Sequence, residues 1–130
     1  MELRITPEYI TTLAEDEIFV FGSNLQGRHG GGAARMAYQN FGAEWGVGVG
    51  HTGQTYAIPT MHGGVEAIKP YVDEFIKYAA SHTQYRYLVT RVGCGIAGFT
   101  SSQIAPLFKG AISLPNVYLP LDWLQILRSC

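Results

Sequence analysis

One stretch of the sequence decides the fold: IFVFGSN at residues 18–24, which continues through LQGRHGGG into AARMAY at residues 33–38. The first part is a continuous apolar run that ends in Gly-Ser-Asn, a pattern typical of a strand buried on both faces. The last part is rich in good helix formers, and we expect that helix to end near Phe41 and Gly42. A buried strand that passes through glycines into a helix is a building unit of α/β proteins.

The rest of the chain continues the alternation of strands and helices. Strands are expected over residues 56–60, 87–92 and 117–121, and helices over residues 65–79 and 101–112. This order predicts an α/β fold with a mixed, largely parallel central sheet. Ligands of such sheets bind beyond the carboxyl ends of the strands.

Three local signals refine the expected helices. Pro70 is expected in the first turn of its helix, where a missing N–H costs nothing. Thr100 and Gln103 fit a capping box at the start of the next helix. Residues 6–8, Thr-Pro-Glu, have the pattern of a capped helix start with proline at the first helical position, so a further short helix is expected there.

The length and the composition favour one domain over residues 1–130. Hydrophobic residues make up 47% of the chain, enough to bury a single core. Charged residues make up only 15% and the formal net charge is -1, which argues against binding of nucleic acid through a broad basic surface. A compact anion site made of backbone N–H groups is compatible with this charge.

The cysteine content and the apolar runs favour a cytoplasmic protein. The two cysteines, Cys94 and Cys130, do not form the pattern of a disulfide scaffold. The residues after Met1 carry no secretory signal pattern, and no apolar run approaches the roughly 18 residues that span a bilayer. No set of cysteines and histidines has zinc-like spacing, so we expect no metal, no cofactor and no membrane contact, and the oligomeric state stays open.

Glycine is the outlier in the composition, at 16 of 130 residues against an average of about 7%. Two clusters, residues 27–32 and residues 93–98, each follow an expected strand and precede an expected helix. Glycines in that position let several backbone N–H groups face one anion, and the helix N-terminus adds positive potential. A third cluster, residues 48–53, has neither neighbour, and we expect a mobile loop there that could act as a lid.

Taken in order, the two loops resemble the ligand loops of the macrodomain family. Residues 21–34 resemble the family's first loop, in which glycines that open a helix follow a buried strand ending in Asn. Residues 93–99 resemble its second loop, and residues 56–60 occupy the place of its middle strand. The similarity covers residues 18–121. It implies a three-layer α/β/α fold that binds ADP-ribose or its derivatives, free or attached to a macromolecule.

The resemblance also implies roles for individual residues. Asn24 would meet the distal ribose, the glycines before Ala33 would line that ribose and the diphosphate, and the late loop would wrap the phosphates from the other side. The ligand-binding residues expected from it are Phe21, Gly22, Ser23, Asn24, Arg28, Gly30, Gly31, Gly32 and Ala33 in the first loop, and Gly93, Cys94, Gly95, Ile96, Ala97, Gly98 and Phe99 in the second.

The sequence departs from the family at the positions where macrodomains carry functional Asp residues. The Asp that grips adenine has its nearest match in Arg4, and the Asp positions of two hydrolysing branches hold Ala34 and Ala97. His29 is therefore the expected general acid–base, because an imidazole side chain suits proton transfer at neutral pH. Asn24 would act with it on the distal ribose.

Several other residues have two interpretations each. Arg28 could neutralise a terminal phosphate of the ligand, and His29 is either the catalytic group or an exposed, idle side chain. Cys94 precedes a helix N-terminus, which lowers a thiol pKa, or it is merely a small residue between two glycines. Trp45 and Tyr56 could stack on adenine, or they belong to the core and the loops.

Three functions follow from these features. The first is a module that reads free or protein-linked ADP-ribose, favoured by intact loops without a catalytic acid. The second is a hydrolase that removes a group from the distal ribose, as in the processing of ADP-ribose 1″-phosphate, favoured by a compact domain on its own. The third is a different dinucleotide-binding protein that uses residues 93–98 and the acid Asp122. Hydrolysis or processing is slightly favoured as the biological role, but binding of ADP-ribose is the firmer expectation.

Overall fold

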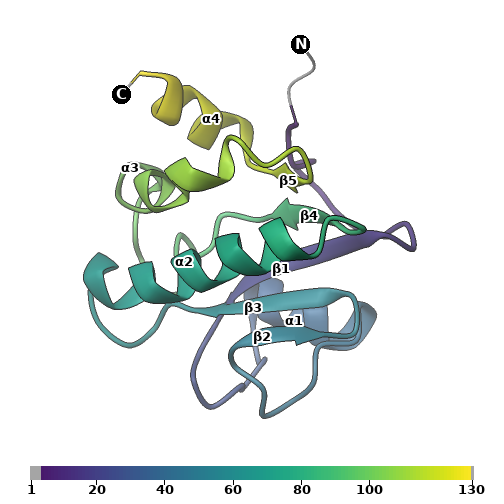
Figure 1. Cartoon of the computed structure of the whole chain (residues 1–130). Coiled ribbons are helices and arrows are strands. Elements are labelled where there is room, and N and C mark those ends of the chain that lie inside the picture. The colour runs from purple at the N-terminus through teal and green to yellow at the C-terminus, as the bar shows by residue number, and fades with distance from the viewer. Residues whose placement is uncertain (1–3, 130) are drawn as a thin grey trace.

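The computed structural model describes residues 4–129 and is an α/β fold built on one five-stranded sheet (Figure 1). Its central strand is β1 (Glu17–Ser23), which comes from the apolar run of residues 18–24. The sheet order is β2-β3-β1-β4-β5. The other strands are β2 (Gly50–Thr52), β3 (Thr55–Pro59), β4 (Arg86–Val89) and β5 (Val117–Tyr118).

The pairing of the strands makes the sheet mixed but largely parallel, as expected. β1 pairs in parallel with both β3 and β4, β4 pairs in parallel with β5, and β2 is antiparallel to β3. Val20 lies opposite Tyr56 of β3 and Val89 of β4. Because β3, β1 and β4 run in the same direction, the loops that follow them emerge at one edge of the sheet.

Helices cover both faces of this sheet. α1 (Gly32–Asn40) packs on the face that carries Phe19 and Phe21, and Figure 1 shows it behind the sheet. Ile18 and Val20 point to the opposite face, because side chains alternate along a strand. The elements that cover this second face are α2 (Val65–Ser81), α3 (Ser101–Ile104), the 3-10 helix η1 (Ala105–Ala111) and α4 (Leu121–Arg128).

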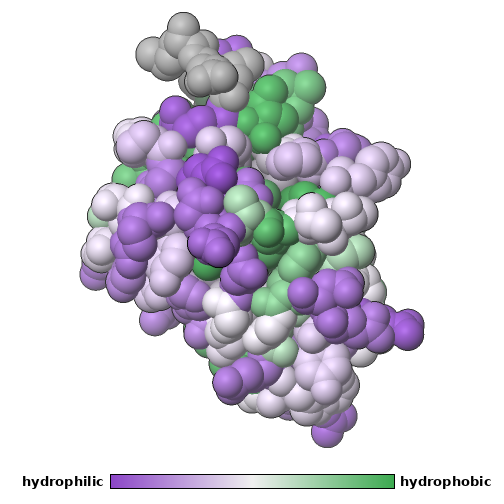
Figure 2. Space-filling model, turned by 90° about the vertical axis from the view of Figure 1, so that its right-hand side faces the viewer, coloured by the Kyte–Doolittle hydropathy of each residue, from purple (hydrophilic) through white to green (hydrophobic). Residues whose placement is uncertain are grey.

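The surface is mostly polar on the face drawn in Figure 2. Hydrophilic residues and residues of intermediate hydropathy cover most of it, and hydrophobic residues form a narrow band that runs from the top to the middle. Several of the largest apolar side chains are fully buried, among them Trp123, Phe75 and Phe108. Within residues 4–129, no helix is both long enough and apolar enough to cross a bilayer.

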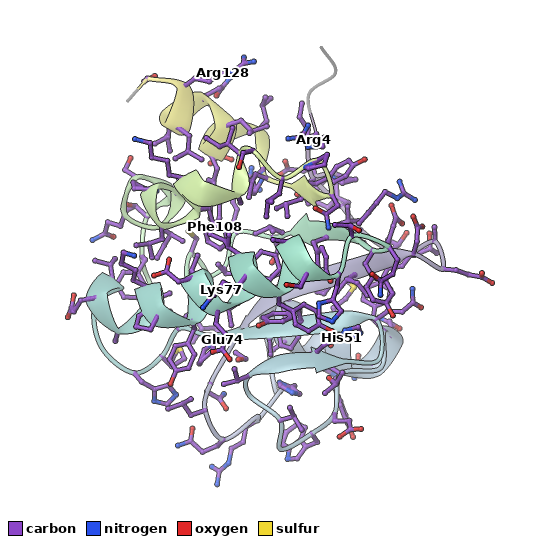
Figure 3. The ribbon with its side chains drawn as sticks, viewed as in Figure 1. Arg4, His51, Glu74, Lys77, Phe108 and Arg128 are labelled. Atoms are coloured by element: carbon purple, nitrogen blue, oxygen red, sulfur yellow. The ribbon has the colours of Figure 1, made fainter. Side chains whose placement is uncertain are left out.

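Two expectations about helices near prolines are wrong. Residues 6–8 form no helix, because the N–H of Thr6 donates to the carbonyl of Leu119 at 2.9 Å and holds this segment extended beside β5. Figure 3 shows the neighbouring Arg4 in this extended segment. Pro70 is the sixth residue of α2 rather than a first-turn residue, since that helix already begins at Val65.

The helix expected over residues 101–112 is confirmed at its start and shorter than predicted. The capping box is present: the hydroxyl of Thr100 accepts from the N–H of Gln103, whose side chain accepts from the N–H of Thr100. The α-helix ends at Ile104 and continues as η1, because Pro106 has no N–H to donate one turn back. The strand expected over residues 117–121 is limited to β5, and the helix α4 that begins at Leu121 is not among the expected elements.

The third glycine cluster, expected to be a mobile loop, contains the short strand β2 over Gly50–Thr52. His51 of β2 (Figure 3) bridges two groups: its Nδ1 lies 2.6 Å from the hydroxyl oxygen of Tyr78, and its Nε2 lies 2.8 Å from the carbonyl oxygen of Gly53. Gly48 packs so closely on the carbonyl of Asn24 that a Cβ there would clash. The cluster therefore supports the first glycine loop rather than covering a site.

Candidate functional site

A cavity of about 180 Å³, here called the loop cavity, lies between the two glycine loops that follow β1 and β4. The loops approach each other closely. A Cβ added to Gly22 would lie 3.2 Å from the backbone nitrogen of Gly93, and one added to Gly31 would lie 3.3 Å from Cδ1 of Ile96. The expected residues that line this cavity are Gly22, Ser23, Asn24, Arg28, Gly31, Gly32, Ala33, Gly93, Gly95, Ile96 and Ala97.

The N-terminus of α1 forms one wall of the loop cavity, and no side chain caps it. Gly31 is the N-cap residue and offers no side-chain acceptor, and the first turn contains no acid. Within the described chain, the N–H groups of Gly32, Ala33 and Ala34 donate no hydrogen bond. Free donors at the positive end of a helix dipole attract an anion.

The second glycine loop forms the opposite wall. Its turn is built from internal hydrogen bonds, in which the N–H of Gly98 donates to Gly95 at 3.0 Å and the N–H of Phe99 donates to Gly93 at 2.9 Å. Gly93 has a φ of 79°, a conformation that favours glycine. The N–H groups of Gly95, Ile96 and Ala97 donate to no other group in residues 4–129. Two sets of free backbone donors therefore flank one small cavity.

Asn24 and Arg28 shape the rim of the loop cavity. The side chain of Asn24 spans the turn, because its Oδ1 accepts from the N–H of Arg28 at 2.8 Å and its Nδ2 donates to the carbonyl of Arg28 at 3.0 Å. The guanidinium of Arg28 makes no ion pair with any residue of the part that the structure describes. It is exposed and available to an anionic group of a ligand.

A second cavity of about 330 Å³, the adjoining cavity, continues from the first. The two share the wall residues Gly32, Ala33, Thr90 and Arg91. Its other lining residues are mainly apolar and come from the N-terminal segment, β1, α1 and the turn before α4: Thr6, Pro7, Glu8, Tyr9, Ile10, Thr11, Phe19, Met36 and Pro120. Together the two cavities form one cleft, with the glycine loops at one end and larger side chains such as Phe19 and Met36 at the other.

Arg91 lies where the two cavities meet and is held in place. Its Nη2 and Nε lie 2.9 Å and 3.2 Å from Oδ1 of Asp122, and Ser101 donates to the same carboxylate at 2.9 Å. Burial raises the pKa of Asp122, but the hydrogen bonds from Arg91 and Ser101 outweigh it and leave that pKa below its usual value. Asp122 lines neither cavity, so it does not occupy the place of a ribose-binding acid.

His29 is buried away from the cleft, which contradicts its expected place beside the distal ribose. Only 1% of the residue is exposed, and its Nε2 lies 2.9 Å from the carbonyl oxygen of Glu44. The ring stands edge-on to Phe21, with the ring centroids 5.3 Å apart. His29 lines neither cavity, and the alternative of an exposed, idle histidine is wrong as well.

Five further residues of the expected ligand set do not line the loop cavity: Phe21, Gly30, Cys94, Gly98 and Phe99. Phe21 is fully buried in the core, and Phe99 packs against the backbone of Gly93. Burial raises the pKa of the Cys94 thiol, partly offset by a hydrogen bond with Ser101. This is the opposite of the shift expected at a helix N-terminus.

The candidates for stacking and gripping adenine also lie elsewhere. Tyr56 is buried against Phe75, with the ring centroids 5.0 Å apart. Trp45 stands edge-on to Tyr38 at 5.3 Å and lines neither cavity. The guanidinium of Arg4 donates to backbone carbonyls near β5. None of these three side chains lines the cleft.

Sequence reasoning missed two groups of lining residues. Thr60, Met61, Thr90 and Val92 follow β3 and β4, and the rule that ligands lie beyond the carboxyl ends of parallel strands was enough to find them. The N-terminal segment from Thr6 to Thr11 carried no such signal. It lines the adjoining cavity because it runs beside β5, which the sequence does not reveal.

No protein-family model, no curated protein and no solved structure gives a significant match to the chain. Within residues 4–129, no group of three or more His, Cys, Asp or Glu side chains is placed to hold a metal ion. Among residues 4–129, no carboxylate, histidine or cysteine side chain lines the loop cavity, which offers backbone hydrogen-bond donors to an anion.

Proposed function

We propose that this protein binds ADP-ribose or an ADP-ribose derivative, with the diphosphate between the two glycine loops. The observation that carries the proposal is the pair of free donor sets, Gly32–Ala34 in α1 and Gly95–Ala97 after β4, on one cavity of about 180 Å³. Each hydrogen bond from such an N–H to a charged oxygen contributes about 1.5–3 kcal/mol. A few of them hold a diphosphate without a lysine.

The shape of the cleft fits the remaining parts of such a ligand. The adjoining cavity, which Phe19 and Met36 help to line, has room for a nucleoside, and it meets the loop cavity at Arg91. At the other end, Asn24 and the unpaired Arg28 would face the distal ribose and any phosphate on it. The helices on both faces of a mixed sheet agree with the three-layer arrangement implied by the resemblance to macrodomains, and we propose that fold assignment here.

The absence of acid–base side chains in the lining of the loop cavity favours a binding module over a hydrolase. His29 is the residue on which hydrolysis was expected to depend, and it lies outside the cleft. A different dinucleotide-binding mode has less support, because Asp122 is bound to Arg91 and Ser101. We therefore propose a reader of free or macromolecule-linked ADP-ribose.

Ala33→Asp tests the proposal at the shared wall of the cleft. An acid in the first turn of α1 stabilises the helix dipole by about 0.3–1 kcal/mol but repels a diphosphate. Calorimetric titration should show that the wild type binds ADP-ribose more tightly than NAD or AMP, and that Ala33→Asp loses affinity at least about a hundredfold without a fall in melting temperature.

The matched control is Ala33→Asn, because asparagine has nearly the same shape as aspartate but carries no charge. It should retain most of the affinity. Equal binding by Ala33→Asp and the wild type would refute a diphosphate at this helix. Turnover of an ADP-ribosylated protein or of ADP-ribose 1″-phosphate by the wild type would show that the binding module is a hydrolase.

A further inference from the structure

Glu8 is the one carboxylate among the residues that line the two cavities within the described chain. Its Oε1 lies 3.6 Å from Nη1 of Arg91. Arg91 belongs to the wall that the cavities share, so this carboxylate lies at the end of the adjoining cavity nearest to the loop cavity. The side chain of Glu8 is 64% exposed, and an ion pair of this kind is weak.

The position of Glu8 corresponds to that of the adenosine ribose in the ligand proposed above. A nucleotide that has its diphosphate between the loops and its base in the adjoining cavity must place the ribose that joins them at the shared wall. Glu8 would therefore lie at the level of the adenosine ribose. Carboxylates bind ribose by accepting hydrogen bonds from its hydroxyl groups, and they disfavour a 2′-phosphate in the same place.

Arg91 does not reverse this preference. A free arginine beside the ribose accommodates a 2′-phosphate, but the guanidinium of Arg91 is already engaged by Asp122 through two nitrogens. Two carboxylates, Glu8 and Asp122, thus face one cation. An additional phosphate would enter a position with an excess of negative charge.

We infer that Glu8 is a specificity-determining residue, which accepts hydrogen bonds from the hydroxyl groups of the adenosine ribose and excludes ligands phosphorylated at its 2′ position. The inference rests on the proposed binding of ADP-ribose and narrows its substrate class. The ligand would then derive from nucleotides with a free 2′-hydroxyl and not from their 2′-phosphorylated counterparts.

The test is a calorimetric comparison of three ligands: ADP-ribose, its 2′-phosphate on the adenosine ribose, and its analogue lacking that 2′-hydroxyl. The affinity of the wild type for each altered ligand should be at least about tenfold lower than its affinity for ADP-ribose. This is the loss expected when one hydrogen bond to a charged group is removed. Glu8→Gln keeps the size of the side chain and removes its charge. It should bring the affinities for ADP-ribose and the 2′-phosphate close together.

Glu74→Gln is the matched control, because Glu74 belongs to α2 and lines neither cavity (Figure 3). It should preserve the preference of the wild type. Equal affinities of the wild type for ADP-ribose and its 2′-phosphate, or an unchanged preference in Glu8→Gln, would overturn the role of Glu8 alone. Failure of the wild type to bind any of the three ligands would overturn the proposed function as well.

Discussion

At the scale of single residues, three buried side-chain atoms have no hydrogen-bond partner in the described part of the chain: Thr6 Oγ1, His29 Nδ1 and Asn116 Oδ1. A buried polar atom without a partner costs about 1–3 kcal/mol. Thr6 is the most easily tested, because its backbone N–H has a separate role in holding the N-terminal segment against Leu119. Its hydroxyl can be removed without disturbing that bond.

Thr6→Val should stabilise the protein by about 1 kcal/mol, because valine keeps the shape of threonine and removes an unpaired buried hydroxyl. Urea unfolding followed by tryptophan fluorescence measures the change in the free energy of unfolding. Destabilisation of similar size would mean that the hydroxyl is hydrogen-bonded in solution.

Individual residues also differ in how well the sequence predicts their place in the site. Asn24 and the glycines of both loops were found because their spacing after a strand carries the signal. His29 was placed wrongly, because a histidine between glycines looks exposed. Its burial depends on contacts with Glu44 and Trp45, which lie in a separate segment. The residues around His29 in the sequence do not indicate such tertiary contacts.

At the scale of elements, the local pattern of residue types was sufficient to predict β1, α1, β3, α2 and β4, all of which contribute buried residues to the core. It failed for β2, whose three residues are only partly buried, and for the residues before β1, whose extended form is set by pairing with Leu119. Short edge elements depend on their neighbours more than on their own sequence.

Two glycines that hold the first loop form a matched pair for mutation. Gly27 has a φ of 67° and Gly46 a φ of 93°, and the N–H of Gly46 donates to the carbonyl of Gly27 at 2.9 Å. A Cβ on Gly27 would collide with the backbone of Gly46 and Val47, whereas one on Gly46 would meet nothing within 4 Å.

Gly46→Ala should therefore cost about 1–2 kcal/mol, the strain of a left-handed backbone. Gly27→Ala should cost roughly 3 kcal/mol or more, because the clash adds to that strain. Chemical denaturation of both variants gives the difference directly. Equal losses would mean that the loop of residues 42–49 does not pack on the first glycine loop as described.

At the scale of the whole molecule, the candidate site exists because β1 and β4 are parallel neighbours. Their loops are far apart in the sequence, and the sheet order brings them to one edge. The alternation of strands and helices predicted a parallel sheet, and the resemblance to macrodomains predicted that the loops meet. The adjoining cavity was not predicted, because it depends on the path of the N-terminal segment.

The proposed function depends on backbone amides of both loops binding one diphosphate. The most direct measurement is a ¹H–¹⁵N NMR titration of the uniformly labelled protein with ADP-ribose. The largest shifts should fall on the N–H groups of Gly32, Ala33, Gly95 and Ile96, together and with one saturation curve. Shifts confined to one loop, or to residues outside both, would contradict it.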